Sequence, residues 1–228
     1  MNCLRNTAAL ISLTIAGSVL ASGTPLQTYP DVNSWLAAVT ALGDATFEGQ
    51  APVNGSTSYN NSAGYTEAGV KFVGYSGGYD LMIVNPGSVN WWYNFGSGAS
   101  LSTVGSTLYP VSIVATLPAN MTAVALNVMV AGNAGLPVVV TASDGSSATI
   151  PTTSGQASFF GAIYATPITS LTVASNGTPP SGTYVLLDNF RYGTADSDGL
   201  PGNAPEIATM LLIGTGLLAM AAFRKRMI

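Results

Sequence analysis

The carboxylates are the side chains of this sequence with the widest choice of chemistry. The sequence contains no histidine, and its one cysteine is Cys3. Serine–histidine and cysteine–histidine nucleophiles and histidine-ligated zinc are therefore excluded. Four carboxylates lie on or beside the strands predicted below: Glu48, Glu67, Asp80 and Asp188. Glycoside hydrolysis needs two opposed carboxylates roughly 5–10 Å apart, and nothing in this spacing indicates such a pair. We therefore expect a protein that is not an enzyme.

Calcium is the ligand that two of these carboxylates favour. Ca²⁺ takes about 6–8 oxygen ligands, and carboxylate, amide and carbonyl oxygens all serve. Glu48 and Asp188 lie on the first and last predicted strands, and the neighbours of Asp188 add a carbonyl at Leu187 and an amide at Asn189. We predict that Glu48 and Asp188 share one structural calcium ion. The alternatives are a solvated strand-end carboxylate and a turn-capping aspartate, and no other cofactor is indicated.

The densest aromatic stretch is Trp91, Trp92 and Tyr93, followed by Phe95. In a strand, alternation places Trp91, Tyr93 and Phe95 on one face and Trp92 on the other. One face should pack in the core. The other can present a flat ring to a sugar, since exposed apolar patches mark binding surfaces. The stretch is therefore a candidate ligand-stacking site for a polysaccharide, and the alternative is core packing of the whole set.

Charge is scarce in this chain. Charged residues make up 7% of its 228 residues, against roughly 25% in an average domain. Between Ser22 and Pro205 the basic residues are Lys71 and Arg191. The carboxylates there number nine, which gives a formal charge of two minus nine, or −7. A nucleic-acid partner requires a basic patch that neutralises phosphates, and two separated cations do not form one. Nucleic acid is excluded as a partner.

Residues 1–21 have the pattern of a secretory signal peptide. Arg5 supplies the positive charge, residues 8–20 form the apolar region, and small residues precede a cleavage site after Ala21. The alternative is an uncleaved N-terminal anchor. Both interpretations predict export.

Residues 30–43 have an amphipathic helical pattern that Asp31 or Asn33 can cap and Gly43 can end. We expect this helix to cover one end of a sheet. From residue 44 onward, short apolar segments alternate with Gly, Asn, Ser and Pro clusters, which is typical of an all-β antiparallel sandwich. The strands are predicted at 45–48, 68–74, 81–84, 91–95, 111–117, 122–130, 138–142, 148–151, 157–161, 170–174 and 184–192.

The clearest alternation lies within residues 122–130, and the apolar residues on its one face are Val124, Leu126, Val128 and Val130. Residues 143–146 form a predicted hairpin turn, because the Asp-Gly pair at its centre suits positive φ angles. Residues 54–64 are a predicted polar loop. Residues 194–204, rich in Asp, Gly and Pro, are a predicted flexible linker.

The C-terminus holds an uncharged apolar segment at residues 207–223. A helix rises about 1.5 Å per residue, so this segment is near the minimum length for a helix that crosses a hydrocarbon core of roughly 30 Å. Three cations, Arg224, Lys225 and Arg226, follow it directly, and such a cluster prefers the cytoplasmic side of a membrane. We predict a single transmembrane helix at 207–223, with everything before it outside the cytoplasm. The alternative is an apolar helix docked on the core of a soluble protein.

The segment from Pro205 to Arg226 resembles the PEP-CTERM sorting signal, also catalogued as the ice-binding protein C-terminal domain. The shared features are the Pro205-Glu206 motif, an apolar helix with a Gly-Thr-Gly-Leu-Leu centre, and the terminal basic cluster. The third motif position, usually a second proline, is Ile207 here. The resemblance implies that an exosortase-like membrane transpeptidase recognises the signal, removes the helix and transfers the protein to the cell surface or extracellular polymer.

The body of the chain also looks like the β-sandwich domains that commonly precede this signal. The shared features are the pair Phe47-Glu48, a Gly-Val-x-Phe strand at 69–72, a Phe-Phe-Gly strand at 159–161 and a closing Leu-Asp-Asn-Phe at 187–190. This resemblance implies a jelly-roll-like antiparallel β-sandwich.

The expected organisation is a signal peptide at 1–21, a β-sandwich ectodomain at 22–193, a linker at 194–204 and a sorting signal at 205–228. The expected function is that of an exported, membrane-anchored and exosortase-sorted surface or matrix protein without catalytic activity. It should reside in the inner membrane with its ectodomain outside the cytoplasm, and after sorting at the cell surface or outside the cell. The alternative is a carbohydrate-binding module of the cell surface or exopolysaccharide. A more distant alternative is a glycan-active hydrolase.

Overall fold

The computed structural model describes residues 25, 27–75, 77–78, 80–86, 95, 98–103, 111–131, 136–153, 155–176 and 183–196. Several predicted features lie outside these residues. They are the signal peptide, the aromatic residues Trp91, Trp92 and Tyr93, the motif Pro205, Glu206 and Ile207, the helix at 207–223, and the cations Arg224, Lys225 and Arg226. Within the described ranges, no helix has the length and apolar character to cross a membrane.

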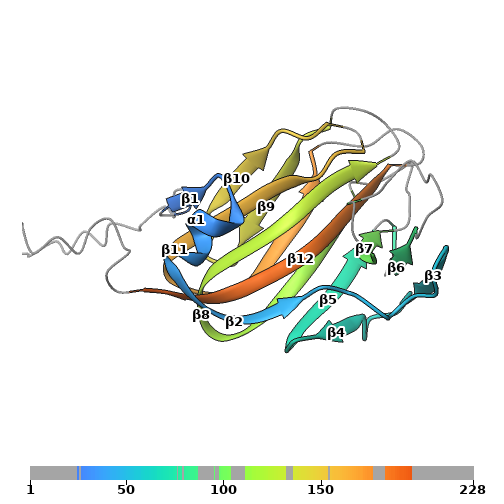
Figure 1. The fold of residues 1–228 in the computed structure, drawn as a ribbon, viewed down its shortest axis with the longest axis horizontal. Helices are drawn as coiled ribbons and strands as arrows, with labels where there is room; N and C mark the ends of the chain where they lie inside the picture. The colour runs from blue at the N-terminus through green and yellow to red at the C-terminus, as the bar shows by residue number, and fades with distance from the viewer. Residues whose placement is uncertain are drawn as a thin grey trace, which may run out of the picture.

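The described chain folds into antiparallel strands and one short helix (Figure 1). In chain order the elements are β1 Gln27–Tyr29, α1 Val32–Leu36, β2 Val39–Ala45, β3 Gly55–Ser58, β4 Tyr65–Glu67, β5 Val70–Tyr75, β6 Leu81–Asn85, β7 Ser100–Thr103, β8 Ser112–Ala131, β9 Val138–Ala142, β10 Ser147–Ile150, β11 Ser158–Ser175 and β12 Tyr184–Ala195. The strands pair in the order β10-β9-β11-β8-β12-β7-β6-β3. In addition, β1 pairs with β11, β2 with β12, β4 with β5, and β5 with β8. The expected class, an all-β antiparallel sandwich, is confirmed.

Two long strands, β8 and β11, take part in both layers of the sandwich. Residues 112–116 of β8 and 170–175 of β11 form the first sheet, together with β4, β5, β9 and β10. The remainders of β8 and β11 form the second sheet, together with β1, β2, β3, β6, β7 and β12. The register of the β8–β11 pair shifts between Ile163 and Ser170, where both strands pass from one sheet to the other.

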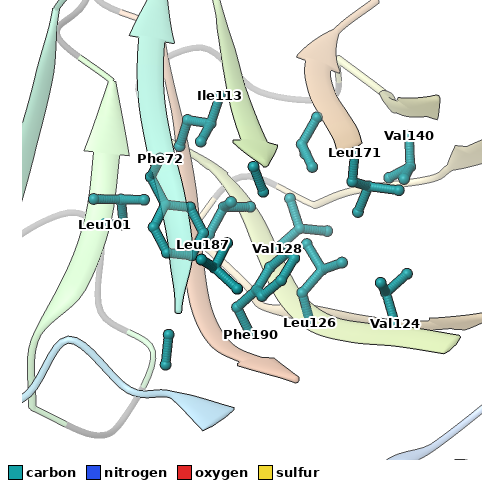
Figure 2. Close-up of a cluster of buried hydrophobic side chains, with 14 of the residues drawn as sticks. Phe72, Leu101, Ile113, Val124, Leu126, Val128, Val140, Leu171, Leu187 and Phe190 are labelled. Atoms are coloured by element: carbon teal, nitrogen blue, oxygen red, sulfur yellow. The ribbon is translucent and has the colours of Figure 1, made fainter. Parts of the chain in front are cut away.

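Apolar side chains from the inner faces of both sheets form one core. Every second residue of a strand points to the same face, so the core takes alternate residues. Figure 2 shows ten of these buried side chains: Phe72, Leu101, Ile113, Val124, Leu126, Val128, Val140, Leu171, Leu187 and Phe190. The rings of Phe72 and Phe190 meet edge to face at 5.3 Å between centroids. The prediction that alternate residues of 122–130 share one face is confirmed, since all four lie in this core.

Helix α1 covers the outer face of the second sheet at one end, beside β11 (Figure 1). Asp31 is its N-cap, and the carboxylate accepts hydrogen bonds from the backbone N–H groups of Asn33 and Ser34. Trp35 is fully buried, and its indole N–H donates to the carbonyl of Ala162 at 3.4 Å. The indole lies against Gly161, where an added Cβ would be 3.0 Å from the ring. The expectation that the helix covers one end of a sheet is confirmed.

The predicted length of that helix is wrong. The helix ends at Leu36, and residues 39–45 form β2, which pairs with β12. The β-branched residues Val39 and Thr40 favour a strand, and the ladder with β12 outweighs the helical spacing of the apolar residues. The strand predicted at 45–48 is also wrong, because β2 ends at Ala45. The predicted linker starts too early, because Thr194 and Ala195 are the last residues of β12.

Most other predicted strands exist, several with different ends. The single strand β8 replaces the two strands predicted at 111–117 and 122–130. The single strand β11 replaces those predicted at 157–161 and 170–174. Four strands were not predicted: β1, β3, β4 and β7. Of these, β3 lies in the predicted loop 54–64. The hairpin turn at 143–146 is confirmed between β9 and β10. Gly145 there has a φ of 86°, and the side chain of Asp144 accepts from the backbone N–H of Ser146.

Replacement of Trp35 by alanine should lower the free energy of unfolding by about 3–5 kcal/mol, because it empties a fully buried site between α1 and β11. The neighbouring change Leu36→Ala is the matched control, since Leu36 is 42% exposed and surface changes cost about 0.5 kcal/mol or less. Urea unfolding of the 22–203 fragment measures both. Equal costs for the two variants would show that α1 does not pack as described.

Candidate functional site

The closing Leu-Asp-Asn-Phe segment forms a bulge in β12. Leu187 and Phe190 both point into the core, so two residues, not one, separate them. The register with β8 shifts between Asp188 and Arg191, and Asn189 has a left-handed φ of 50°. Asp188 is 2% exposed, and its carboxylate accepts the backbone N–H of Asn189 at 2.7 Å. Leu186 lies on the outer face and Leu187 in the core, so alternation directs the buried carboxylate of Asp188 to the outer face, and the extra residue of the bulge returns Phe190 to the core.

Glu48 lies in a turn after β2, whereas the sequence analysis placed it on a strand. Phe47 before it has a left-handed φ of 61°, which ends the ladder with β12. The Glu48 carboxylate accepts the backbone N–H of Ala99 at 3.0 Å. An added Cβ at Gly98 would lie 2.1 Å from the carboxylate oxygens, so this contact requires glycine at position 98. Glu48 thus links the end of β2 to the start of β7.

The structure brings Glu48 and Asp188 to the same corner of the second sheet. Phe190 pairs with Ala45, and this antiparallel register leads toward Asp188 on one strand and Glu48 on the other. Leu187 pairs with Leu101 of β7, and the carboxylate of Glu48 accepts the backbone N–H of Ala99 just before that strand. The segments that carry Glu48 and Asp188 are therefore neighbours in the fold.

These residues fit calcium only in part. Among the described residues, no group of three or more acidic, histidine or cysteine side chains gathers at one place. Two carboxylates supply at most four oxygens, so carbonyl and amide oxygens would have to supply the others. The shared ion stays a prediction.

Glu67, a third candidate carboxylate, has a structural role. One of its oxygens accepts the backbone N–H groups of Thr46 and Phe47 at 3.0 and 3.1 Å. The other accepts the hydroxyl of Tyr65 at 2.6 Å. The pKa of the Tyr65 hydroxyl is raised above its ordinary value, mainly by burial and to a lesser extent by the hydrogen bond to Glu67. Glu67 therefore holds the residues after β2 against the β4–β5 hairpin, and the sequence analysis missed this role.

The hydroxyl of Tyr192 reinforces the same junction, because it donates to the carbonyl of Ala68 in the β4–β5 turn. The Tyr192 ring lies over Gly43 of β2, where an added Cβ would be 2.4 Å from ring atoms. Ala68 and Gly69 both have positive φ, as a two-residue type I′ hairpin turn requires. A Tyr-x-Glu strand before such a turn is a weak sequence signal, and only the fold reveals its partners.

The aromatic stretch meets the outer face of the second sheet through Phe95. Phe95 packs with Met82 and Tyr184 against a buried cluster that consists of Val84, Met129, Ala131 and Leu186. These cluster residues alternate with core residues along β6, β8 and β12, so they lie on the face opposite the core. Phe95 therefore packs outside the inter-sheet core, and its predicted neighbours Trp91, Trp92 and Tyr93 lie outside the described residues.

No family model and no curated protein matches this chain. Similar solved structures include a module named TmCBM61 in complex with β-1,4-galactotriose, with a TM-score of 0.38 and 17% identity over 60% of this chain and 99% of that one. A family 11 carbohydrate-binding module from Clostridium thermocellum, in complex with a β-1,3-1,4-mixed-linked tetrasaccharide, has a TM-score of 0.35 and 15% identity over 68% and 98%. A family 22 module of Clostridium thermocellum Xyn10B has a TM-score of 0.36 and 13% identity over 74% and 98%.

Calcium should raise the melting temperature of the 22–203 fragment relative to chelator. An ion that binds only the native state stabilises it by about 2.7 kcal/mol at one hundred times its dissociation constant. Glu48→Gln should abolish the rise, whereas Glu67→Gln should keep it, because Glu67 already accepts internal hydrogen bonds. Thermal unfolding of the three proteins in calcium and in EDTA is the measurement. Superimposable curves for the unchanged fragment would rule the ion out.

Proposed function

We propose that this chain is an exported, non-catalytic protein of the cell surface or extracellular matrix, and that its sandwich binds a neutral polysaccharide. The observation that carries the binding part is the position of Phe95 on the outer face of the second sheet. An aromatic stretch inside the core would have no access to a ligand. Because Phe95 packs on an outer face, we propose that the aromatic stretch before it is accessible to a ligand.

Trp92 is the residue of the stretch that we propose for sugar stacking. Phe95 packs toward the sheet, and in the strand that the sequence predicts at 91–95 alternation places Trp92 on the face opposite Phe95. Tryptophan is the side chain with the largest flat apolar surface, and it dominates binding energies at interfaces.

The charge of the ectodomain supports a neutral partner. A formal charge of −7 with two basic residues repels polyanions such as nucleic acid and acidic polymers. One of those two, Arg191, is already paired with Asp44 at 3.1 Å. A neutral, hydroxyl-rich chain avoids both the repulsion and the cost of desolvating charges.

The delivery part of the proposal rests on the resemblance at residues 205–226. An exosortase-like transpeptidase recognises Pro205, Glu206 and Ile207 after the helix at 207–223 has entered the membrane, and it passes the sandwich to the surface. The membrane is thus a temporary partner. The hydrolase alternative loses one candidate, because Glu67 is held by three internal hydrogen bonds.

The 22–203 fragment should bind one or more neutral polysaccharides on a glycan array, and Trp92→Ala should weaken that binding about tenfold or more, which is about 1.4 kcal/mol. Leu36→Ala is the matched control, because it removes an exposed apolar side chain from α1 and should leave the affinity unchanged. Affinity electrophoresis in the polysaccharide selected by the array measures the change. Failure of the unchanged fragment to bind any glycan would contradict the proposal.

A fluorescent protein fused after Ile228 should be active and a phosphatase fused there inactive, because Arg224, Lys225 and Arg226 prefer the cytoplasmic side. The same two reporters fused after Asn203 should give the opposite result, and they serve as the control. Paired phosphatase and fluorescent-protein fusions measure both. Phosphatase activity of the Ile228 fusion would contradict the predicted topology.

A further inference from the structure

The first and last strands of the sandwich reach the same end of the second sheet. Gly193 of β12 pairs with Ala123 of β8, Ala123 pairs with Ile163 of β11, and Gln27 of β1 also pairs with Ile163. Paired residues of neighbouring strands lie side by side, so these four residues form one row across the sheet. Trp35 of α1 belongs to the same buried cluster as Ala123 and Ile163. We call this row together with α1 the α1 end, and Figure 1 shows β1, α1 and the end of β12 gathered there.

Hydrogen bonds fasten the end of β12 to the α1 end. The backbone N–H of Asp196 donates to the carbonyl of Ala38 at 3.1 Å, and the Asp196 carboxylate accepts the hydroxyl of Thr40 at 2.6 Å. The backbone N–H of Ala195 donates to the hydroxyl of Thr122 at 2.8 Å. A membrane anchor farther along the chain is therefore connected to the sandwich at the α1 end.

The connection between the sandwich and the predicted membrane span is short. Ten residues, 197–206, separate Asp196 from that span. Fully extended they would reach about 35 Å, and a flexible chain of this length has a root-mean-square end-to-end distance of about 17 Å. Phe95 packs at the other end of the sheet, in a cluster with Ala131, which is about 27 Å from Ala123 along β8. The tether therefore keeps the α1 end closer to a membrane than the Phe95 cluster.

The α1 end also exposes apolar surface. Leu36, the last residue of α1, is 42% exposed, and Ala37 after it is exposed as well. The other large hydrophobic side chains exposed among the described residues are Val53, before β3, and Tyr75, at the end of β5. Leu36 is thus the exposed large hydrophobic side chain that lies where the tether begins.

We infer that the α1 end faces the outer surface of the lipid bilayer while the chain is anchored, and that Leu36 contacts the lipid interface. One partly exposed leucine is too little to hold a free protein on a membrane. The tether makes the contact intramolecular, and a short flexible linker gives an effective concentration in the millimolar range, so a weak contact is sufficient. The inference rests on the proposed function in one respect, namely that residues 207–223 span the membrane.

Electrostatic attraction has no part in this contact. Anionic lipids attract lysine and arginine, and residues 31–40 contain neither. The charged side chains next to α1 and β2 include the carboxylates of Asp31 and Asp196, which anionic lipids repel. Arg191 is paired with Asp44 at 3.1 Å. The contact is therefore apolar and favours neutral lipids, and the orientation directs the Phe95 cluster away from the membrane, toward an external polymer.

Energy transfer from a dye on the protein to labelled lipid headgroups tests the inference. The full chain with Cys3→Ser has no other cysteine, so Asn33→Cys and Gln156→Cys each provide one labelling position. Both residues are exposed. Asn33 lies in α1, and Gln156 follows Gly155, whose backbone N–H donates to the carbonyl of Val130 beside the Phe95 cluster. The chain is reconstituted in phosphatidylcholine vesicles and labelled from outside with an impermeant dye, after each variant has been checked for cooperative thermal unfolding.

We expect transfer from position 33 to exceed transfer from position 156 about twofold or more, because about 27 Å of strand separates the two ends of the sheet. Leu36→Gln should lower the transfer from position 33, because it removes the apolar contact with lipid. Val53→Gln is the matched control, since it removes an exposed apolar side chain elsewhere and should leave the transfer unchanged.

Equal transfer from the two positions, or more from position 156, in a chain that the vesicles retain would overturn the inference and leave the proposed function standing. An unchanged signal in Leu36→Gln would overturn the lipid contact. Transfer from position 33 to a second labelled copy in preference to lipid would assign the α1 end to a dimer and would also overturn the inference. A chain that the vesicles do not retain would overturn both the inference and the delivery part of the proposed function.

Discussion

The pairing of β8 with β11 is the constraint on which the rest of the structure depends. The two strands pair antiparallel along most of their lengths, and their register shifts twice, between Ile163 and Ile168 and between Ile168 and Ser170. Along β8 the core residues have odd numbers up to Met121 and even numbers from Val124, so the alternation changes phase where the strands pass between the sheets. Within either half, a one-residue slip would exchange the core residues of β8 with its outward residues. The fully buried core therefore also fixes which residues point outward.

Local patterns in the sequence predicted what local forces decide. Alternation in 122–130 and the Asp-Gly turn at 143–146 depend on neighbours in the chain, and both exist as expected. The segment after Trp35 was mistaken for helix because its apolar spacing suits one. The ladder with β12, about 150 residues away along the chain, decides otherwise, and Gly43 is needed opposite Tyr192 rather than as a helix end.

The candidate sites divide in the same way. The sequence placed Glu48 and Asp188 on segments that the fold makes neighbours, because β2, which precedes Glu48, pairs with β12. The bulge at Asn189 and the hydrogen bonds of Glu67 were not foreseen, since they depend on backbone angles and on contacts about 20 residues away.

The scarcity of charge has different consequences for stability and for solubility. Among the described residues, Arg191 and Asp44 form an ion pair whose side chains are 20% and 40% exposed. Ion pairs that are this accessible to water contribute about 0–1 kcal/mol to the free energy of unfolding. Removing charges therefore costs the fold little, because burial and the backbone ladders hold it. The cost falls instead on the exposed sheet faces and edges, which lose the repulsion that keeps proteins apart. Uncharged strands are thus compatible with a stable fold.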